Sequence, residues 1–457
     1  EADAELCERI HADPNIDYLT IHIWPVNWGW APRSNPDSGI DNACAKSSQY
    51  IALHTDMANR LGKPLVIEEF GYSRQGNRSG IGIPTDSRDQ FYSHIFGEVK
   101  RSIEEGGPIA GCNFWGWGGN GRPRDLVWRA GDDYLSDPPH EPQGWYSVFD
   151  CDTTTIDMHI EKVLALDLVD VEAIKQANFK VAYDAVCSTG GLVLTKLLNA
   201  LGVQQVVALN PEPTGLFPHN PEPLPENITQ ICEEVVKQGC DVGFIVDPDV
   251  DRLAIVCENG KPFVEEYTLV SVADYVLDHT SGATVSNMSS TKALRDVTEA
   301  KGQRYYASAV GEVNVVEKMK EMNAVIGGEG NGGIIYPALH YGRDALVGIA
   351  LFLSLLAKSG KTCSQLRATY PEYEISKNKI ELTPDINVDS ILEKMAKKYA
   401  DYEVSTIDGV KIMFEKEWVH LRKSNTEPII RIYSESRDME SADRLAKKIM
   451  QEIMELK

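Results

Sequence analysis

Short apolar segments alternate with helix-like stretches along the chain, and this alternation limits the possible folds more than any other feature. Three such segments lie in the first third of the chain: YLTIHIWP (18–25), PLVIEEFG (64–71) and AGCNFWGW (110–117). Three more follow in the middle: FKVAYDAV (179–186), VQQVVAL (203–209) and DVGFIVDP (241–248). Because strands that alternate with helices build parallel sheets, we expect an α/β protein.

The chain changes character near residue 158. All eight tryptophans except Trp418 lie before this point, and none of the residues around Met158 and His159 forms a Pro-, Gly- or Ser-rich linker. A chain of 457 residues exceeds one ordinary core, so two to four domains are expected. We interpret the change as a join between two unlike parts. The chain begins at Glu1 without a methionine, and we expect its true N-terminus to lie further upstream.

Charge and cysteine usage exclude several classes of function. The formal net charge is -23 and the Lys and Arg residues are scattered, which argues against nucleic-acid or anionic-membrane partners. Nine cysteines without a CxxC pair predict reduced thiols and a cytoplasmic protein. The longest apolar run, residues 345–357, is too short to span a bilayer and predicts a buried helix.

The stretch FIVDPDVDRLAIV (244–256) follows an apolar strand with three closely spaced aspartates, Asp247, Asp249 and Asp251. Three carboxylates at the end of a strand suit a hard cation such as Mg²⁺. A calcium loop of the EF-hand type is a weaker alternative, because Arg252 stands where that loop needs Gly and LAIV predicts a strand. A solvated acidic turn remains the other alternative.

Two further polar stretches follow at intervals of roughly 80–90 residues. GGEGNGG (327–333) holds Glu329 on a glycine-rich turn, where a carboxylate could accept hydrogen bonds from sugar hydroxyls, although such turns often have no function. RKSNTEPIIRIYSES (422–436) carries hydroxyl, amide and guanidinium groups suited to a phosphate dianion, or forms an ordinary polar hairpin. Its candidate residues are Arg422, Ser424, Asn425, Thr426 and Arg431.

Together, and in this order, the three stretches resemble the α-D-phosphohexomutase family of phosphoglucomutase, phosphomannomutase and phosphoglucosamine mutase, over residues 159–457. The resemblance implies two α/β/α mixed-sheet domains (159–265 and 266–368), a C-terminal α+β domain (369–457), a phosphorylated hexose as partner and Mg²⁺ as cofactor. It implies that Asp247, Asp249 and Asp251 bind the metal and that Arg252 lies beside a phosphoserine. It also implies that Glu329 and Asn331 contact the sugar, while Arg422, Ser424, Asn425, Thr426 and Arg431 hold the phosphate.

The sequence departs from this family in one decisive respect. The family's first domain carries a phosphorylated serine in a T-x-S-H-N-P loop, and no such loop occurs here. The segment LFPHNPEP (216–223) has Phe217 and Pro218 before its His and offers no hydroxyl. Pro248 and Asn331 also replace residues common in the family, and the loop 308–315 lacks a basic residue, which leaves substrate preference open. We therefore expect binding without completed isomerisation.

The first 158 residues resemble the C-terminal part of a glycoside hydrolase family five β-mannanase, as the last three strands of a (β/α)₈ barrel. The resemblance implies that Glu69 is the nucleophile, His22 its neighbour and Trp115 the sugar platform for a mannan-type polysaccharide. The second carboxyl that retaining hydrolysis needs lies in an Asn-Glu pair, which this sequence lacks. Taken singly, the glutamate pair is also typical of a strand end, and the tryptophans of a core.

Three hypotheses follow. The first is a phosphohexomutase-like isomerase acting on hexose 1- and 6-phosphates with Mg²⁺, inactive without its phosphoserine domain. The second is a fragment of a retaining endo-β-mannanase. The third is a non-catalytic sugar-phosphate-binding fusion, or an artefactual fusion created in sequence assembly.

Overall fold

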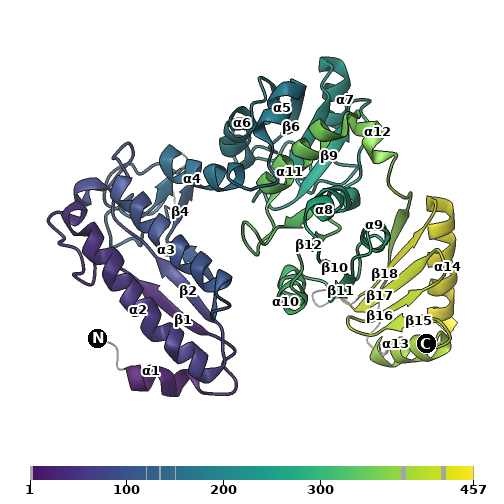
Figure 1. Ribbon diagram of the computed structural model, residues 1–457, viewed down its shortest axis with the longest axis horizontal. Helices are drawn as coiled ribbons and strands as arrows, with labels where there is room; N and C mark the ends of the chain where they lie inside the picture. The colour runs from purple at the N-terminus through teal and green to yellow at the C-terminus, as the bar shows by residue number, and fades with distance from the viewer. Residues whose placement is uncertain are drawn as a thin grey trace. The chain divides into compact units, whose positions relative to one another are not determined.

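The computed structural model describes residues 4–119, 121–132, 135–149, 151–381, 388–423 and 429–455 (Figure 1). The chain divides into two compact units, Glu1–His159 and Ile160–Lys457. Each unit has its own sheets and its own buried apolar clusters. They are therefore considered one at a time.

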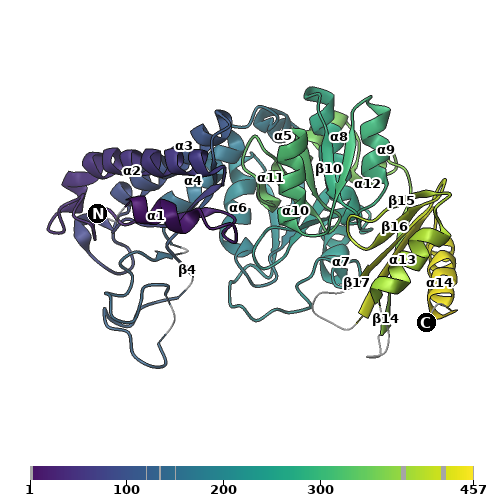
Figure 2. The same cartoon turned by 90° about the horizontal axis from the view of Figure 1, so that it is seen from below.

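The first unit is built on a parallel three-stranded sheet in the order β1-β2-β3. The strands are β1 (Leu19–Ile23), β2 (Leu65–Phe70) and β3 (Ile109–Phe114). Helices α2 (Ile40–Leu61) and α3 (Asp86–Glu104) connect them and lie side by side (Figure 2). The predicted β-α-β-α-β order is confirmed, while its origin in a barrel stays a prediction. The smaller elements are α1 (Ala4–His11), η1 (Pro36–Gly39), η2 (Gln75–Asn77), β4 (Trp117–Gly119), β5 (Val148–Phe149) and α4 (Thr153–Leu164).

The second unit contains two four-stranded sheets with the same strand pattern. The first has the strand order β7-β6-β8-β9 and the second the order β11-β10-β12-β13. In both sheets the first three strands are parallel to one another and the fourth pairs antiparallel with the third. The strands of the first sheet are β6 (Lys180–Asp184), β7 (Gln205–Leu209), β8 (Val242–Val246) and β9 (Leu253–Cys257). Those of the second are β10 (Thr284–Asn287), β11 (Tyr305–Ser308), β12 (Ile326–Glu329) and β13 (Gly333–Ile335).

Helices cover these two sheets and separate them. They are α5 (Val171–Ala177), α6 (Gly190–Ala200), α7 (Thr229–Gln238), α8 (Glu266–His279), α9 (Ala293–Ala300), α10 (Glu312–Met322), α11 (Ala345–Ser359) and α12 (Cys363–Arg367). The third sheet of the unit is antiparallel, in the order β14-β18-β17-β16-β15, with α13 and α14 on one face (Figure 2). Its elements are β14 (Glu374–Glu381), α13 (Val388–Lys398), β15 (Glu403–Ser405), β16 (Val410–Met413), β17 (Trp418–Lys423), β18 (Ile429–Ser436) and α14 (Met439–Glu455).

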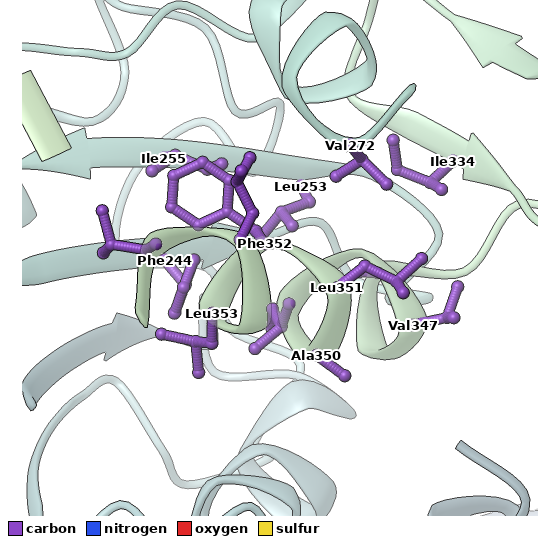
Figure 3. Close-up of a cluster of buried hydrophobic side chains, with 14 of the residues drawn as sticks. Phe244, Leu253, Ile255, Val272, Ile334, Val347, Ala350, Leu351, Phe352 and Leu353 are labelled. Atoms are coloured by element: carbon purple, nitrogen blue, oxygen red, sulfur yellow. The ribbon is translucent and has the colours of Figure 1, made fainter. Parts of the chain in front are cut away.

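Helix α11 holds the first two sheets together. Its residues from Ala345 to Leu356 are all buried, which confirms the predicted buried helix. Figure 3 shows Phe352 beside Phe244 and Ile255 of the first sheet, and Leu351 toward Val272 and Ile334. The rings of Phe244 and Phe352 meet edge to face at 6.1 Å. Among the residues described, no helix has both the length and the apolar character needed to cross a bilayer.

Two hairpins from different sheets contact each other through their backbones. We call residues 247–252, which join β8 to β9, the acidic hairpin, and residues 330–332, which join β12 to β13, the glycine hairpin. The N–H of Leu253 donates to the carbonyl of Gly332 at 3.1 Å, and Arg252 forms a bridge with Gly333. Gly332 has φ +88°, and a Cβ there would lie 2.3 Å from the Leu253 carbonyl oxygen. This close approach requires glycine.

We expect Gly332→Ala to destabilise the chain more than Gly302→Ala does. Gly302 has a similar φ of +70° but open space where a Cβ would be, so its replacement costs only backbone strain of about 1–2 kcal/mol. The Gly332 variant adds the clash with Leu253 and separates the hairpins. Thermal unfolding of both variants measures the difference, and equal losses would contradict the docking of the hairpins.

Candidate functional site

The acidic hairpin brings three carboxylates together. One oxygen from each of Asp247, Asp249 and Asp251 lies within 4.8 Å of the others. Asp247 is buried, and its Oδ1 accepts the backbone N–H groups of Asp251 and Arg252 at 3.1 and 3.0 Å. These bonds hold the turn closed, so the carboxylates converge because of the hairpin's own backbone. The segment LAIV lies in β9, so the predicted strand, which argued against a calcium loop, is confirmed.

Two guanidinium groups lie against these carboxylates. Arg252 Nε is 3.4 Å from Asp247 Oδ2 and 3.8 Å from Asp251 Oδ1, and Arg343 Nη2 donates to Asp251 Oδ2. The Arg252 guanidinium also lies 3.5 Å from Glu222. Asp251 Oδ1 is buried and has no hydrogen-bond partner among the described residues. An orphaned carboxylate oxygen in an all-oxygen donor set fits a hard divalent cation.

Burial and mutual repulsion disturb the titration of this cluster. Burial, together with Asp251 and Asp249, raises the pKa of Asp247 to about 7, although the Arg252 N–H opposes the shift. Burial also raises the pKa of Asp251, while Arg343 opposes the increase. A carboxyl with such a pKa holds its proton near neutrality unless a cation displaces it.

Glu329 at the end of β12 is buried and its orientation is fixed. Its Oε1 accepts from Asn287 Nδ2 at 2.8 Å and from the Gly311 N–H at 3.3 Å, while Oε2 accepts from Arg343 Nη1 at 2.8 Å. Asn331 lies in the glycine hairpin, where its Oδ1 accepts the Gly333 N–H at 3.2 Å. Both sugar candidates therefore lie on or beside the hairpin that contacts the acidic hairpin.

Arg422 and Arg431 stand directly opposite each other on β17 and β18. Directly opposed residues of antiparallel strands project from the same face, and two like charges there repel unless an anion lies between or beside them. Arg422 Nη1 is 3.6 Å from Asp408 Oδ2. The other three predicted phosphate contacts, Ser424, Asn425 and Thr426, lie outside the described residues.

Hydrogen bonds connect the third sheet to the second. Lys411 Nζ donates to the Met288 carbonyl at 2.7 Å, Ser289 Oγ lies 2.9 Å from His420 Nδ1, and the Val310 N–H donates to Asp408 at 3.0 Å. Burial lowers the pKa of Lys411 to about 8 and that of His420 to about 4. Asp408 thus touches both Arg422 and the loop 308–315, whose Gly311 N–H reaches Glu329.

Sequence reasoning missed three of these residues: Arg343, Asp408 and Asn287. Arg343 contacts Asp251 of the acidic hairpin and Glu329 beside the glycine hairpin, yet in the sequence it follows the unremarkable segment YPALHYG. Asp408 and Asn287 each lie beside a turn and carry no motif. No local pattern in the sequence indicates these contacts, because each of the three residues acquires its role from partners in other elements of the fold.

The first unit places His22 and Glu69 on paired strands. His22 Nδ1 is 3.2 Å from Glu69 Oε2, and His22 Nε2 is 3.3 Å from Glu68 Oε2. Trp115 follows β3, and its ring meets Trp24 edge to face at 6.3 Å. A histidine between two carboxylates can hydrogen-bond a sugar hydroxyl, and an indole face can stack against a sugar ring.

Comparison with known proteins defines the class of the second unit. Its residues match three family models of phosphoglucomutase/phosphomannomutase: alpha/beta/alpha domain II (157–260), alpha/beta/alpha domain III (265–373) and the C-terminal domain (380–452). Residues 1–169 match a model described as GH family 5 beta-mannosidase-like. The chain is thus similar to two unrelated sugar-acting classes over different stretches.

Whole proteins support the match of the second unit. The phosphoglucomutase/phosphomannomutase of Thermococcus kodakarensis is 39% identical over 278 residues, covering 60% of either chain. A probable phosphoglucosamine mutase of Methanococcoides burtonii is 31% identical over 314 residues, covering 67% of this chain and 68% of the other. The crystal structure of a putative phosphomannomutase from Thermus thermophilus has a TM-score of 0.56 and 24% identity, covering 69% of either chain, and shows a shared fold.

The chain belongs to the phosphoglucomutase/phosphomannomutase family. It spans about 60% of the length of the Thermococcus relative. The predicted family resemblance is confirmed, together with the α/β class of the second unit.

The raised pKa of Asp247 predicts how stability depends on pH when divalent cations are removed by EDTA. Asp247 has an ordinary pKa of 3.8 in the unfolded chain and a pKa of about 7 in the folded chain. At a pH between these two values, the folded chain therefore keeps a proton on Asp247 that the unfolded chain has lost. The stabilisation from this carboxyl is therefore full below pH 4 and is lost as the pH rises through 7. We expect Asp247→Asn to gain about 2–3 kcal/mol relative to wild type between pH 5 and pH 8, because the linkage amounts to about 1.4 kcal/mol for each pH unit up to the folded pKa.

Urea unfolding at both pH values measures this difference. The control is Asp401→Asn, at an exposed acidic residue away from both hairpins. If the difference between wild type and Asp247→Asn is the same at pH 5 and pH 8, the proposed titration of Asp247 is wrong.

Proposed function

We propose that residues 160–457 bind a phosphorylated hexose together with Mg²⁺, as the sugar- and metal-binding part of a phosphohexomutase. One observation carries the proposal: side chains from the acidic hairpin and the glycine hairpin region meet on Arg343, which bonds both Asp251 and Glu329. Two polar turns without a function would not need to share a side-chain partner. A site that binds a cation and a hydroxylated ring together needs its cation ligands and its sugar ligands close to each other.

The cation would be held by Asp247, Asp249 and Asp251, whose carboxylate oxygens offer the ligands that Mg²⁺ prefers. When bound, Mg²⁺ neutralises charge that develops on a phosphoryl group. Arg252 lies beside these carboxylates and is exposed by about 30%, so its guanidinium can turn from them toward a phosphoryl oxygen. Glu329, already fixed by three donors, would accept hydrogen bonds from the ring hydroxyls, next to Asn331.

Arg422 and Arg431 would hold the phosphate of the substrate. Their shared face on β17 and β18 provides two positive charges at one place. Arg422 lies 3.6 Å from the Asp408 carboxylate, a distance typical of a weak ion pair that a phosphate dianion can replace. Ser424, Asn425 and Thr426 belong to the same proposal on the basis of the family resemblance.

The sequence has no T-x-S-H-N-P loop to carry the phosphoryl group. Positioning and charge neutralisation accelerate phosphoryl transfer only where a donor is present. We therefore propose that this chain binds hexose phosphates but does not interconvert their 1- and 6-phosphates.

Two calorimetric titrations of the full chain test the proposal, one with Mg²⁺ and one with glucose 1-phosphate in the presence of Mg²⁺. We expect saturable binding in the presence of Mg²⁺ and a loss of at least about tenfold in Mg²⁺ affinity in Asp249→Ala, because one of three ligands is removed. The matched control is Asp401→Ala, an exposed acidic residue away from the hairpins. No binding heat in wild type would contradict the binding proposal, and turnover to glucose 6-phosphate would contradict the missing donor.

A second candidate function concerns the first unit. The contacts of His22 with Glu69 and Glu68, and the match of residues 1–169 to a GH family 5 beta-mannosidase-like model, favour binding of a mannose-type saccharide. Glu69 would be the nucleophile, His22 its hydrogen-bonding neighbour and Trp115 the stacking platform. Since the Asn-Glu pair that supplies the acid/base is absent from the sequence, we propose binding without cleavage.

We expect no release of reducing ends when the chain is incubated with β-mannan. Binding of mannobiose, followed by tryptophan fluorescence, should weaken several-fold in Trp115→Ala because the stacking face is lost. Trp128→Ala serves as the control, since within the described part of the chain Trp128 makes no ring contact with Trp24 or Trp115. Reducing-end release that disappears in Glu69→Gln would overturn the absence of hydrolysis.

A further inference from the structure

Arg343 lies where the acidic hairpin and the glycine hairpin meet, and its guanidinium faces three carboxylates. Nη2 donates to Asp251, Nη1 lies 2.8 Å from Glu329 Oε2, and Nε lies 3.3 Å from Glu312 Oε2. The side chain is only about 14% exposed. Two nitrogens of the guanidinium therefore hydrogen-bond different carboxylates, and the third lies within ion-pair distance of Glu312 without a hydrogen bond.

The backbone around Arg343 holds this position. The Arg343 N–H donates to Glu312 Oε1 at 2.8 Å, Ile335 forms a bridge with Arg343, and the N–H of Asp344 donates to the Ile334 carbonyl at 2.9 Å. The side chain runs across Gly333, where a Cβ would lie 2.4 Å from the Arg343 Cδ. The arginine is thus fixed at its backbone, along its stem and at its head.

We propose that Arg343 is a positioning residue that links the cation site to the sugar site: its charge sets the cation affinity of Asp251, and its fork orients Glu329. This inference rests on the proposed function of the second unit. The two roles are physically separate. The charge acts on any cation near Asp251 through Coulomb repulsion, whereas orientation of Glu329 depends on a planar group that reaches two carboxylates at once.

The separation of roles predicts opposite effects on the two ligands. Arg343→Met removes a positive charge beside Asp251, so Mn²⁺, used as the cation probe, should bind about threefold or more tightly at pH 8. The same variant should bind glucose 1-phosphate about fivefold or more weakly, because Glu329 loses a charged partner and its fixed orientation. A general loss of structure would weaken both ligands together.

Arg343→Lys separates charge from geometry. A lysine keeps the positive charge but cannot bond Asp251 and Glu329 as a planar fork does. We expect Mn²⁺ affinity within about twofold of wild type, and glucose 1-phosphate affinity still reduced by about fivefold or more. Arg295→Met is the matched control: Arg295 also bonds two carboxylates, Glu299 and Glu403, away from both hairpins, so neither affinity should change.

The experiment measures Mn²⁺ binding by electron paramagnetic resonance and glucose 1-phosphate binding by calorimetry, on the full chain, with melting temperatures of every variant. Unchanged sugar affinity in Arg343→Lys, or unchanged or weaker Mn²⁺ affinity in folded Arg343→Met, overturns the inference. If Arg343→Met does not fold, Arg343→Gln carries the same loss of charge and is judged by the same two affinities. If wild type binds neither ligand, it is the proposed function that fails.

Discussion

The close contact between two hairpins is the constraint on which the candidate site depends. Each hairpin joins the third and fourth strands of its own mixed sheet, and α11 packs between the sheets so that the hairpins meet. The bond from Leu253 to Gly332 leaves no room for a side chain at the glycine. With the backbones fixed at this distance, a single arginine can reach a carboxylate on either side. The metal and sugar candidates therefore become one site because of packing rather than because of sequence proximity.

Repulsion between like charges in the candidate site would be smaller with an oppositely charged ligand bound than without one. Burial and mutual repulsion raise the pKa values of Asp247 and Asp251, and two arginines offset only part of that repulsion. On the third sheet, Arg422 and Arg431 share a face. Acidic and basic groups are thus concentrated at separate places that a cation and a phosphate would each stabilise. The family relation of the second unit and the local charges of its described residues lead to the same expectation.

The strands, the buried helix and several candidate site residues could be predicted from the sequence because each is indicated by a short stretch of neighbouring residues. Alternating apolar segments predicted the strands of both units, and the run 345–357 predicted a buried helix, since burial on all sides needs no knowledge of neighbours. Asp247, Glu329 and Arg422 could be picked out because each lies in a compact polar stretch next to a strand. The roles assigned to them, and to Glu69, His22 and Trp115 in the first unit, remain predictions. Arg343, Asp408 and Asn287 were missed because their importance comes from partners in other elements.

By itself, the sequence showed a resemblance to the family in three short motifs, and its strand periodicity determined the α/β class. Both signals are properties of neighbouring residues, and so is the identity of the charged groups. Only the tertiary structure decided which of these groups meet. Asp251 and Glu329 are 78 positions apart, and their common partner Arg343 is separated from Asp251 by 92. Such contacts depend on how two sheets pack across a helix, and packing is set by the shapes of many buried side chains together rather than by any one stretch of chain.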